Sequence, residues 1–237
     1  MTHTDHRSAR QRPPLAVWSC GPDDGTAVTE RLAEHLVHEY TSRGHTIADL
    51  TGTGKVAHHA ERVGRASEVD ASTSPEFAEP NVRAVAWADL TVTTLPAQDE
   101  PRRARGRRAR AQVTFASMIT RPGGVIAAIT PVGHAPDGAL IDPAPGLVRA
   151  ATRAGLVYMQ HVIALTTPIC GSGLGAAIPV RTHDEERISE ADVGNLPVTV
   201  AEAAATITSP AHLNVSVFRV PEKDPDPVNE STGEVAA

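Results

Sequence analysis

Segments with strand character alternate along this chain with segments of helical periodicity, and no other feature constrains its fold as strongly. Apolar residues recur every fourth position between 28 and 40, which predicts a helix over 26–43 that ends at Gly44. Further helices are expected at 55–64, 111–120 and 145–154. Strands are expected at 15–19, 46–50, 65–70, 89–94, 125–130, 156–166 and 213–219. This alternation predicts an α/β fold, in which helices flank a mainly parallel, Rossmann-like sheet.

The last two expected strands depart from the alternation, because no obvious crossover helix separates 156–166 from 213–219. An antiparallel pair at one edge of the sheet fits this spacing, with 213–219 as an antiparallel C-terminal edge strand. A parallel sheet that ends in such a hairpin is the arrangement of class I methyltransferases.

Charge and hydropathy predict one folded domain between two tails. The 237 residues carry a formal net charge of −6, and 41% of them are hydrophobic. Residues 1–14 combine arginines with two prolines, and residues 221–237 are acidic and proline-rich with few apolar side chains. Both ends are therefore expected to be disordered, and the folded domain is expected at 15–220.

Several classes of protein are excluded by composition. No apolar run approaches the roughly 18 to 20 residues of a membrane span, and the N-terminus has no apolar stretch of a secretory signal. The two cysteines, Cys20 and Cys170, cannot form a disulfide framework. These features predict a cytoplasmic protein that does not bind a membrane.

The segment 49–55 (DLTGTGK) places two glycines between an expected strand and an expected helix. Glycines allow a sharp turn and a close approach to a ligand, and the helix N-terminus offers free N–H groups. A P-loop is excluded, because Val56 follows Lys55 and Asp49 occupies the position of the first glycine. A dinucleotide site with Asp70 at the ribose, a methyltransferase cofactor turn and a plain turn without ligand all remain compatible with the residues.

The order of several further segments resembles the DNA amino-methyltransferases of the N4-cytosine/N6-adenine type, most closely a compact bacterial group. The segments are LAVW at 15–18, the glycine turn, ADLTVTTLPA at 88–97, RPGG at 121–124, AGLV at 154–157 and VSVFR at 215–219. The resemblance covers much of 15–220 and implies the class I methyltransferase fold.

The resemblance also implies a cofactor and a set of site residues. In this family the glycine turn and nearby acids hold S-adenosylmethionine, which implies Asp49, Gly52, Gly54 and Asp70 as cofactor-binding residues. The target amino group of a flipped base is held at the end of the next strand. The implied catalytic segment here is Thr94, Leu95 and Pro96, where the Thr94 hydroxyl and the Leu95 carbonyl would accept hydrogen bonds from the amine.

Both motifs depart from the family pattern. The family sequence SPPY is replaced by TLPA, so that Leu95 replaces a proline and Ala97 replaces the aromatic residue. The lost aromatic removes a stacking surface worth about 1–3 kcal/mol per base. Aligned on the glycines, the family acid falls at Ala48, and Asp49 is one place late. These departures predict a methyltransferase-like protein with reduced or lost activity.

Six arginines lie in the nine-residue stretch 102–110, which is part of a segment expected to be a loop at 98–110. They are Arg102, Arg103, Arg105, Arg107, Arg108 and Arg110. Such a cluster can bind the phosphates of DNA with salt-dependent affinity. It also supports an alternative function, a non-enzymatic module that binds nucleic acid or an acidic protein through the arginines. The competing interpretation is a solvated loop.

The eleven histidines form no recognisable metal motif in the sequence. His58 and His59 are adjacent and would point in different directions on a helix, and His35 and His38 have no neighbouring cysteine or acid cluster to complete a zinc set. No metal site is therefore predicted.

Overall fold

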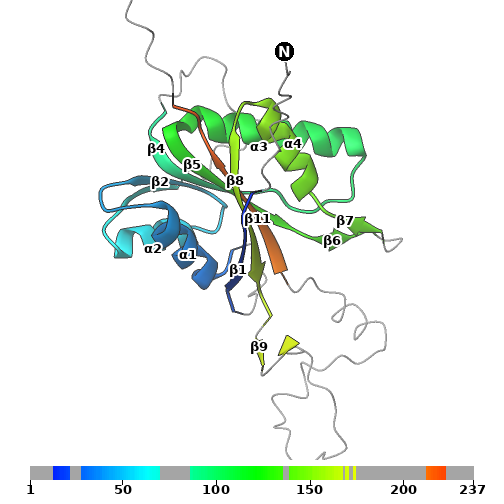
Figure 1. Cartoon of the computed structure of the whole chain (residues 1–237), viewed down its shortest axis with the longest axis horizontal. Coiled ribbons are helices and arrows are strands. Elements are labelled where there is room, and N and C mark those ends of the chain that lie inside the picture. The colour runs from blue at the N-terminus through cyan, green and yellow to red at the C-terminus, as the bar shows by residue number, and fades with distance from the viewer. Residues whose placement is uncertain are drawn as a thin grey trace, which may run out of the picture.

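Figure 1 shows a computed structural model of the chain, in which one seven-stranded sheet is covered by two helices on each face. The structure describes residues 13–21, 28–69, 86–135, 139–167, 169–170, 173–174 and 212–222. The strands of the sheet are β1 (Leu15–Ser19), β2 (Thr46–Leu50), β3 (Ala66–Val69), β4 (Ala88–Thr94), β5 (Thr120–Pro131), β8 (Val157–Leu165) and β11 (His212–Arg219). The helices are α1 (Glu30–Tyr40), α2 (Lys55–Arg62), α3 (Arg102–Ile119) and α4 (Ala144–Arg153). Two short strand pairs lie outside the sheet: β6 (Gly133–His134) with β7 (Leu140–Ile141), and β9 (Ile169–Cys170) with β10 (Gly173–Leu174).

The strand order of the sheet is β1-β8-β11-β5-β4-β2-β3. Six strands are parallel to one another, and β11 is antiparallel to both of its neighbours, β5 and β8. This confirms the predicted α/β fold with a mixed, mainly parallel sheet in the class I methyltransferase arrangement.

The predicted position of the antiparallel strand was wrong in one respect. β11 is not an edge strand, because it lies between β5 and β8, and β1 pairs in parallel with the outer side of β8. The sequence shows that 156–166 and 213–219 form a hairpin-like pair, but it does not show that the N-terminal strand adds to this end of the sheet.

The two faces of the sheet bury separate apolar clusters, as the alternation of side chains along β5 shows. Val125, Ala127 and Ile129 contribute to the cluster under α1 and α2, whereas Ile126 and Ala128 contribute to the cluster under α3 and α4. α1 begins at its N-cap Thr29, whose hydroxyl accepts a hydrogen bond from the Leu32 N–H (3.1 Å).

The arginine-rich segment is helical, which corrects the expectation of a loop at 98–110. α3 begins at Arg102 and is 18 residues long. Arginine is a good helix former, and the buried residues Ala109, Val113 and Ala116 share one face at helical spacing. The apolar spacing therefore reaches back into the arginine run, where the density of charge obscured it.

Several expectations fall outside the described residues. These are Asp70, most of the expected tails (residues 1–12 and 223–237) and most of the segment between β8 and β11. In the part of the chain that the structure does describe, no helix combines the length and the hydropathy that a membrane crossing requires.

Candidate functional site

The candidate site lies at the carboxyl ends of β2 and β4, which are adjacent and parallel. The helix that follows β2 packs on one face of the sheet, and the helix that follows β4 packs on the other (Figure 1). Such a switch point leaves a crevice outside the strand ends, where open α/β sheets bind their ligands.

The glycine turn after β2 has the backbone conformation that only glycine adopts without strain. Gly52 and Gly54 have φ angles of 73° and 70°, in the left-handed region. A Cβ atom added to either glycine would meet no atom within 4 Å, apart from its chain neighbours. Gly54 is also the N-cap residue of α2. The turn therefore presents bare backbone and open space at the start of a helix.

Asp49 is buried, with 1% of its surface exposed, and its carboxylate closes the turn from inside. One oxygen accepts hydrogen bonds from the N–H (3.0 Å) and the hydroxyl (2.6 Å) of Thr51, and the other accepts from the N–H of Ala57 (3.1 Å) in the first turn of α2. Both oxygens are thus engaged within the protein, and Asp49 shapes the turn and caps α2. Its predicted contact with a cofactor remains a prediction.

Lys55, the first residue of α2, ties the glycine turn to the segment before α1. Its Nζ donates a hydrogen bond to the backbone carbonyl of Val28 (3.0 Å). The hydroxyls of Thr51 and Thr53 lie 2.8 Å apart and link the two sides of the turn. The turn is therefore held by polar contacts on both sides of its open face.

The TLPA segment continues from the end of β4 and is fixed by its neighbours. Thr94 is half-buried, and Leu95 is buried against α3 and α4, with its N–H donating to the carbonyl of Ile129 (2.9 Å). The Pro96 carbonyl accepts a hydrogen bond from Arg108 (3.0 Å). Ala97 lies against Gly133, where an added Cβ would stand 2.9 Å from the Ala97 methyl. The backbone at Gly133 therefore fills the space beside the Ala97 side chain.

The six predicted arginines divide into two groups. Arg102, Arg103, Arg107 and Arg110 are exposed. Arg108 instead pairs with Glu100 through its Nη2 (2.6 Å) and Nε (2.9 Å), and the Arg105 Nη2 donates to the Glu100 carbonyl (3.0 Å). Two of the six arginines therefore hold the segment between β4 and α3, and four are exposed to solvent.

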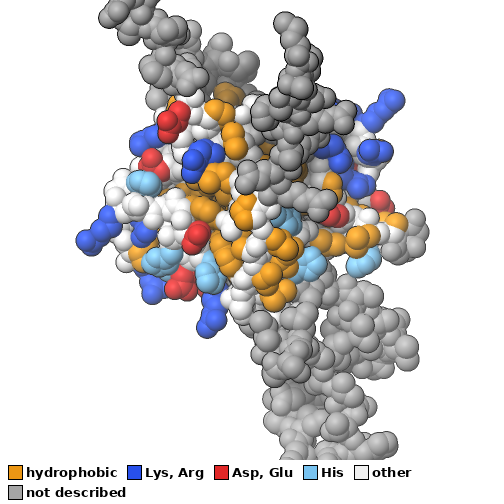
Figure 2. Space-filling model, viewed as in Figure 1, with side chains coloured by type: hydrophobic (Ala, Val, Ile, Leu, Met, Phe, Trp, Pro, Cys, Tyr) orange, Lys and Arg blue, Asp and Glu red, His pale blue; other side chains and the backbone are white. Residues whose placement is uncertain are grey.

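A cleft of about 610 Å³ lies between α3 and α4, and Leu95 is one of the residues that line it. It is lined by five arginines and one acid: Arg102, Arg105, Arg110, Arg149, Arg153 and Asp142. The Arg105 Nε is buried there without a hydrogen-bond partner among the described residues. Figure 2 shows Lys and Arg side chains gathered over the right-hand end of α3. The cleft is a strongly positive surface beside the TLPA segment.

Sequence reasoning missed Arg149 and Arg153, since they lie far along the chain from the arginine run. Their spacing of four residues on an expected helix predicts a shared face, but only the packing of α4 beside α3 brings that face to the cleft.

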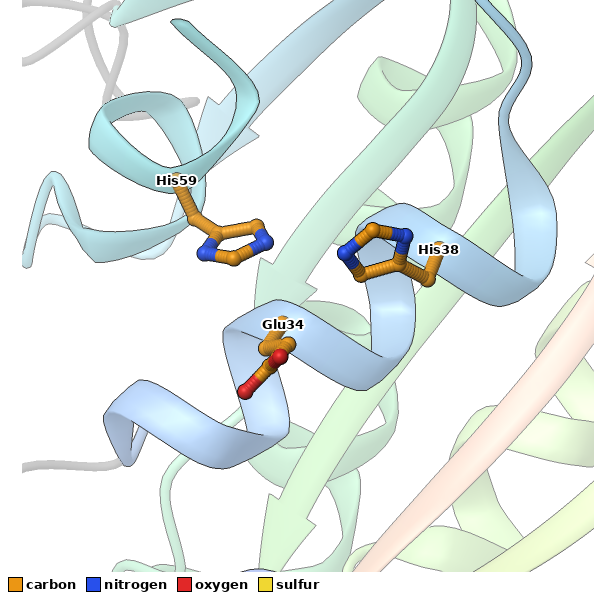
Figure 3. Close-up of side chains that lie close together, drawn as sticks. All are labelled: Glu34, His38 and His59. Carbon is orange, nitrogen blue, oxygen red and sulfur yellow. The ribbon is translucent and has the colours of Figure 1, made fainter. Parts of the chain in front are cut away.

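Sequence reasoning also missed a cluster of Glu34, His38 and His59, in which one potential ligand atom from each side chain lies within 4.8 Å of the others. Glu34 and His38 are one turn apart on α1, and His59 reaches them from α2 (Figure 3). Burial lowers the pKa of His59 below its ordinary value, although the charge of Glu34 opposes this shift. The i, i+4 spacing of Glu34 and His38 was visible in the sequence; the approach of α2 was not.

Cys20 is 2% exposed. Its buried thiol is therefore not placed to react with a ligand at the glycine turn or at the TLPA segment. Burial raises the pKa of the Cys20 thiol to about 11, so the group stays protonated at neutral pH.

Comparisons with known proteins give structural likenesses only. No protein-family model matches the chain, and no curated protein matches it. Among solved structures it is similar to TrmN from Thermus thermophilus, with 15% identity and a TM-score of 0.44 over 82% of this chain and 49% of that chain. It is also similar to geranyl diphosphate C-methyltransferase from Streptomyces coelicolor A3(2) in complex with S-adenosyl-L-homocysteine, with 11% identity and a TM-score of 0.45 over 79% of each chain.

A third similar structure is 1,6-didemethyltoxoflavin-N1-methyltransferase from Burkholderia thailandensis, with 12% identity and a TM-score of 0.43 over 84% of this chain and 80% of that chain. The chain spans about half the length of the TrmN structure. The class of fold assigned above rests on the strand order of the sheet itself.

Proposed function

We propose that this protein binds S-adenosylmethionine over the glycine turn and is a methyltransferase-like protein related to the DNA amino-methylases, with reduced or lost activity. The observation that carries the proposal is the pair of left-handed glycines, open to solvent on their Cβ side, at the point where the sheet reverses its strand order.

The surroundings of the turn fit a nucleoside cofactor. β3 is parallel to β2, with Val69 opposite Asp49, so the edge at which β3 ends lies beside the glycine turn. The predicted ribose acceptor, Asp70, follows Val69 in the sequence. Because the Asp49 oxygens are engaged within the turn, backbone groups of the turn and Asp70 would make the polar contacts with the cofactor.

The methyl-accepting side would use Thr94 and the Leu95 carbonyl to orient an exocyclic amine. The amine nitrogen would attack the sulfonium methyl in line; the C–S bond would break, S-adenosylhomocysteine would leave, and the amine would then lose a proton to solvent. Two features support reduced or lost activity. Leu95 replaces the proline that fixes the direction of the accepting carbonyl, and Ala97 offers no surface on which a flipped base could stack.

Isothermal titration of the full chain with S-adenosylmethionine tests the cofactor proposal. Gly52→Ala places a methyl over the turn and should weaken binding about tenfold or more, which corresponds to about 1.4 kcal/mol. Gly64→Ala is the matched control: Gly64 has the same φ of 73°, an equally open Cβ side, and a position at the other end of α2. Absence of heat with the unaltered chain, or equal weakening by both variants, would contradict the proposal.

Transfer of a radiolabelled methyl group to unmethylated DNA tests the activity. We expect turnover to be slow or absent, and Thr94→Val to abolish whatever turnover is present without changing cofactor affinity. Rapid turnover by the unaltered chain would reject the proposed loss of activity. Retention of turnover by Thr94→Val would remove that hydroxyl from the site.

The arginine cleft supports DNA as the macromolecular partner. Five arginines against one acid create a local positive surface on a chain whose net charge is −6, and Leu95 of the proposed amine site lines the cleft. Guanidinium groups bind phosphate through paired hydrogen bonds. The cleft would hold the phosphates that flank a target base, while the glycine turn holds the cofactor.

Salt-dependent binding of a DNA duplex tests the cleft. Arg149→Ala with Arg153→Ala should weaken binding and reduce the slope of log K against log salt by up to about 1.8, or about 0.9 for each phosphate that is no longer neutralised. Arg43→Ala with Arg62→Ala is the control, because these exposed arginines lie on the α1–α2 side. Equal effects of the two double variants would indicate general electrostatic attraction and would reject the cleft as the DNA site.

A further inference from the structure

Glu34, His38 and His59, here termed the helix-pair triad, join α1 to α2 on the side of the molecule away from the arginine cleft. Each residue offers one potential ligand atom, and the three atoms lie within 4.8 Å of one another. Figure 3 shows both imidazole rings turned toward each other across the gap between the helices, with the Glu34 carboxylate beside them. The His38 and His59 ring centroids are 5.4 Å apart, in an edge-on arrangement.

His59 supplies independent evidence that the triad binds a ligand. This residue is 8% exposed, and its Nε2 atom is buried without a hydrogen-bond partner among the residues that the structure describes. Buried polar atoms nearly always have a partner, because an unmade hydrogen bond costs free energy. The adjacent His58 is exposed, so the helix turns only one of its two neighbouring histidines toward α1.

We propose that the helix-pair triad binds a zinc ion through two imidazole nitrogens and one carboxylate oxygen. Two histidines with one acid form a common three-ligand zinc set, and solvent water takes the fourth position. Around a tetrahedral ion with bonds of about 2.0–2.1 Å, ligand atoms stand roughly 3.3 Å apart. The triad closes to this spacing by rotation of Glu34 and His38, whose side chains are exposed, around the fixed ring of His59.

The ligand chemistry separates zinc from other divalent ions. Imidazole nitrogen suits zinc and its neighbours in the first transition series, whereas magnesium and calcium require oxygen ligands. Magnesium is therefore expected to leave the site empty at concentrations at which zinc fills it.

The position of the triad would let the bound ion link α1 to α2. α2 begins at the glycine turn, and Lys55 at its start already contacts the Val28 carbonyl ahead of α1. His59 lies one turn further along α2, on the same side of the helix as Lys55. A zinc ion would add a second link between α1 and α2, and thereby fix the helix whose N-terminus forms part of the turn.

Zinc titration of the untagged full chain, after treatment with a chelator, tests the proposal. We expect one high-affinity zinc ion per chain and a rise in Tm on binding, with magnesium producing neither. His38→Ala and Glu34→Gln should each weaken zinc binding about tenfold or more, and should remove most of the rise in Tm. Both residues are exposed, so neither substitution should prevent folding.

His58→Ala is the matched control, since it removes an exposed histidine from the same helix without touching the triad. It should bind zinc as the unaltered chain does. Unchanged zinc binding by His38→Ala would show that zinc binds elsewhere, for example at His3 and His6, and would overturn the proposal. Equal weakening by His58→Ala and His38→Ala would also overturn it, because His58 is not part of the triad. Failure to bind zinc at micromolar concentration would also overturn it. Neither outcome depends on binding of S-adenosylmethionine.

Discussion

The two sides of the switch point differ in what holds their geometry. On the β2 side, the glycine turn is defined by backbone conformation, with two positive φ angles and one buried carboxylate that closes the loop. On the β4 side, side-chain contacts hold the TLPA segment. Leu95 packs against α3 and α4, and Arg108 binds the Glu100 carboxylate and the Pro96 carbonyl. The shape of the glycine turn therefore depends on three positions, Gly52, Gly54 and Asp49, whereas the TLPA segment depends on side chains from several elements.

Under the proposed function, this difference would allow the cofactor side to keep its geometry while the residues of the amine side change. The turn needs only glycine at two positions and an acceptor at Asp49. The proposed amine site would need a carbonyl fixed by proline and an aromatic stacking surface, and Leu95 and Ala97 stand at those two positions. The following experiments compare matched positions on the two sides, beginning with those of largest expected effect.

Truncation of a buried leucine on each face should cost the same free energy of unfolding. Leu36 in α1 and Leu147 in α4 are both fully buried in separate clusters. Leu36→Ala and Leu147→Ala are each expected to cost about 3 kcal/mol, measured by urea denaturation. A much smaller cost for Leu147→Ala would mean that the α3–α4 side is loosely packed, and that packing rather than local geometry separates the two sides.

Two acids cap helices at the carboxyl edge of the sheet, and their removal should lower the free energy of unfolding by different amounts. Asp49 accepts three hydrogen bonds from the turn and α2, whereas half-buried Asp142 accepts one from the Ala144 N–H at the start of α4 (3.0 Å). Asp49→Ala should cost about 2–3 kcal/mol and Asp142→Ala about 1 kcal/mol, again by urea denaturation. Equal costs would show that the glycine turn does not depend on its buried carboxylate.

Glycine-to-alanine changes should have opposite signs on the two sides. Gly54 has a φ of 70°, so Gly54→Ala should lower the free energy of unfolding by about 1 kcal/mol. Gly106 lies inside α3, where an added Cβ makes only an ordinary contact of 3.8 Å with Arg110, so Gly106→Ala should raise it by up to about 1 kcal/mol. Thermal unfolding of the two variants compares them directly. A loss of stability in Gly106→Ala would mean that the arginine segment is not helical in solution.

Loss of the ion pair between Arg108 and Glu100, on the β4 side, should have the smallest effect on the free energy of unfolding. The Arg108 and Glu100 side chains are 24% and 19% exposed, and their atoms lie 2.6 Å apart. Arg108→Ala should lower the free energy of unfolding by about 1 kcal/mol or less. A double-mutant cycle with Glu100→Ala isolates the pair, and a coupling near zero would show that Arg108 acts on the Pro96 carbonyl alone.

Particular residues show where sequence reasoning succeeded and where it failed. The α/β sheet, the strand ends and the helix after Gly54 follow from local patterns: apolar spacing of two or four residues, and glycines at the turns. The arginine run was wrongly expected to be a loop, because its density of charge concealed the apolar face at Ala109, Val113 and Ala116. The placement of β11 was wrong because strand order depends on which strand pairs with β8, and the residues of β1 that do so are 146 positions from their partners in the sequence.

The sequence by itself determined most helices and strands of the sheet, the glycine turn and the TLPA segment at 94–97, since these depend on interactions between near neighbours in the chain. Tertiary structure alone decided that Arg149 and Arg153 face the arginines of α3, and that His59 meets Glu34 and His38. The physical reason is that helix packing is set by the summed burial of apolar faces. Polar side chains carried on those helices meet wherever the packing places them, at separations that no local pattern encodes.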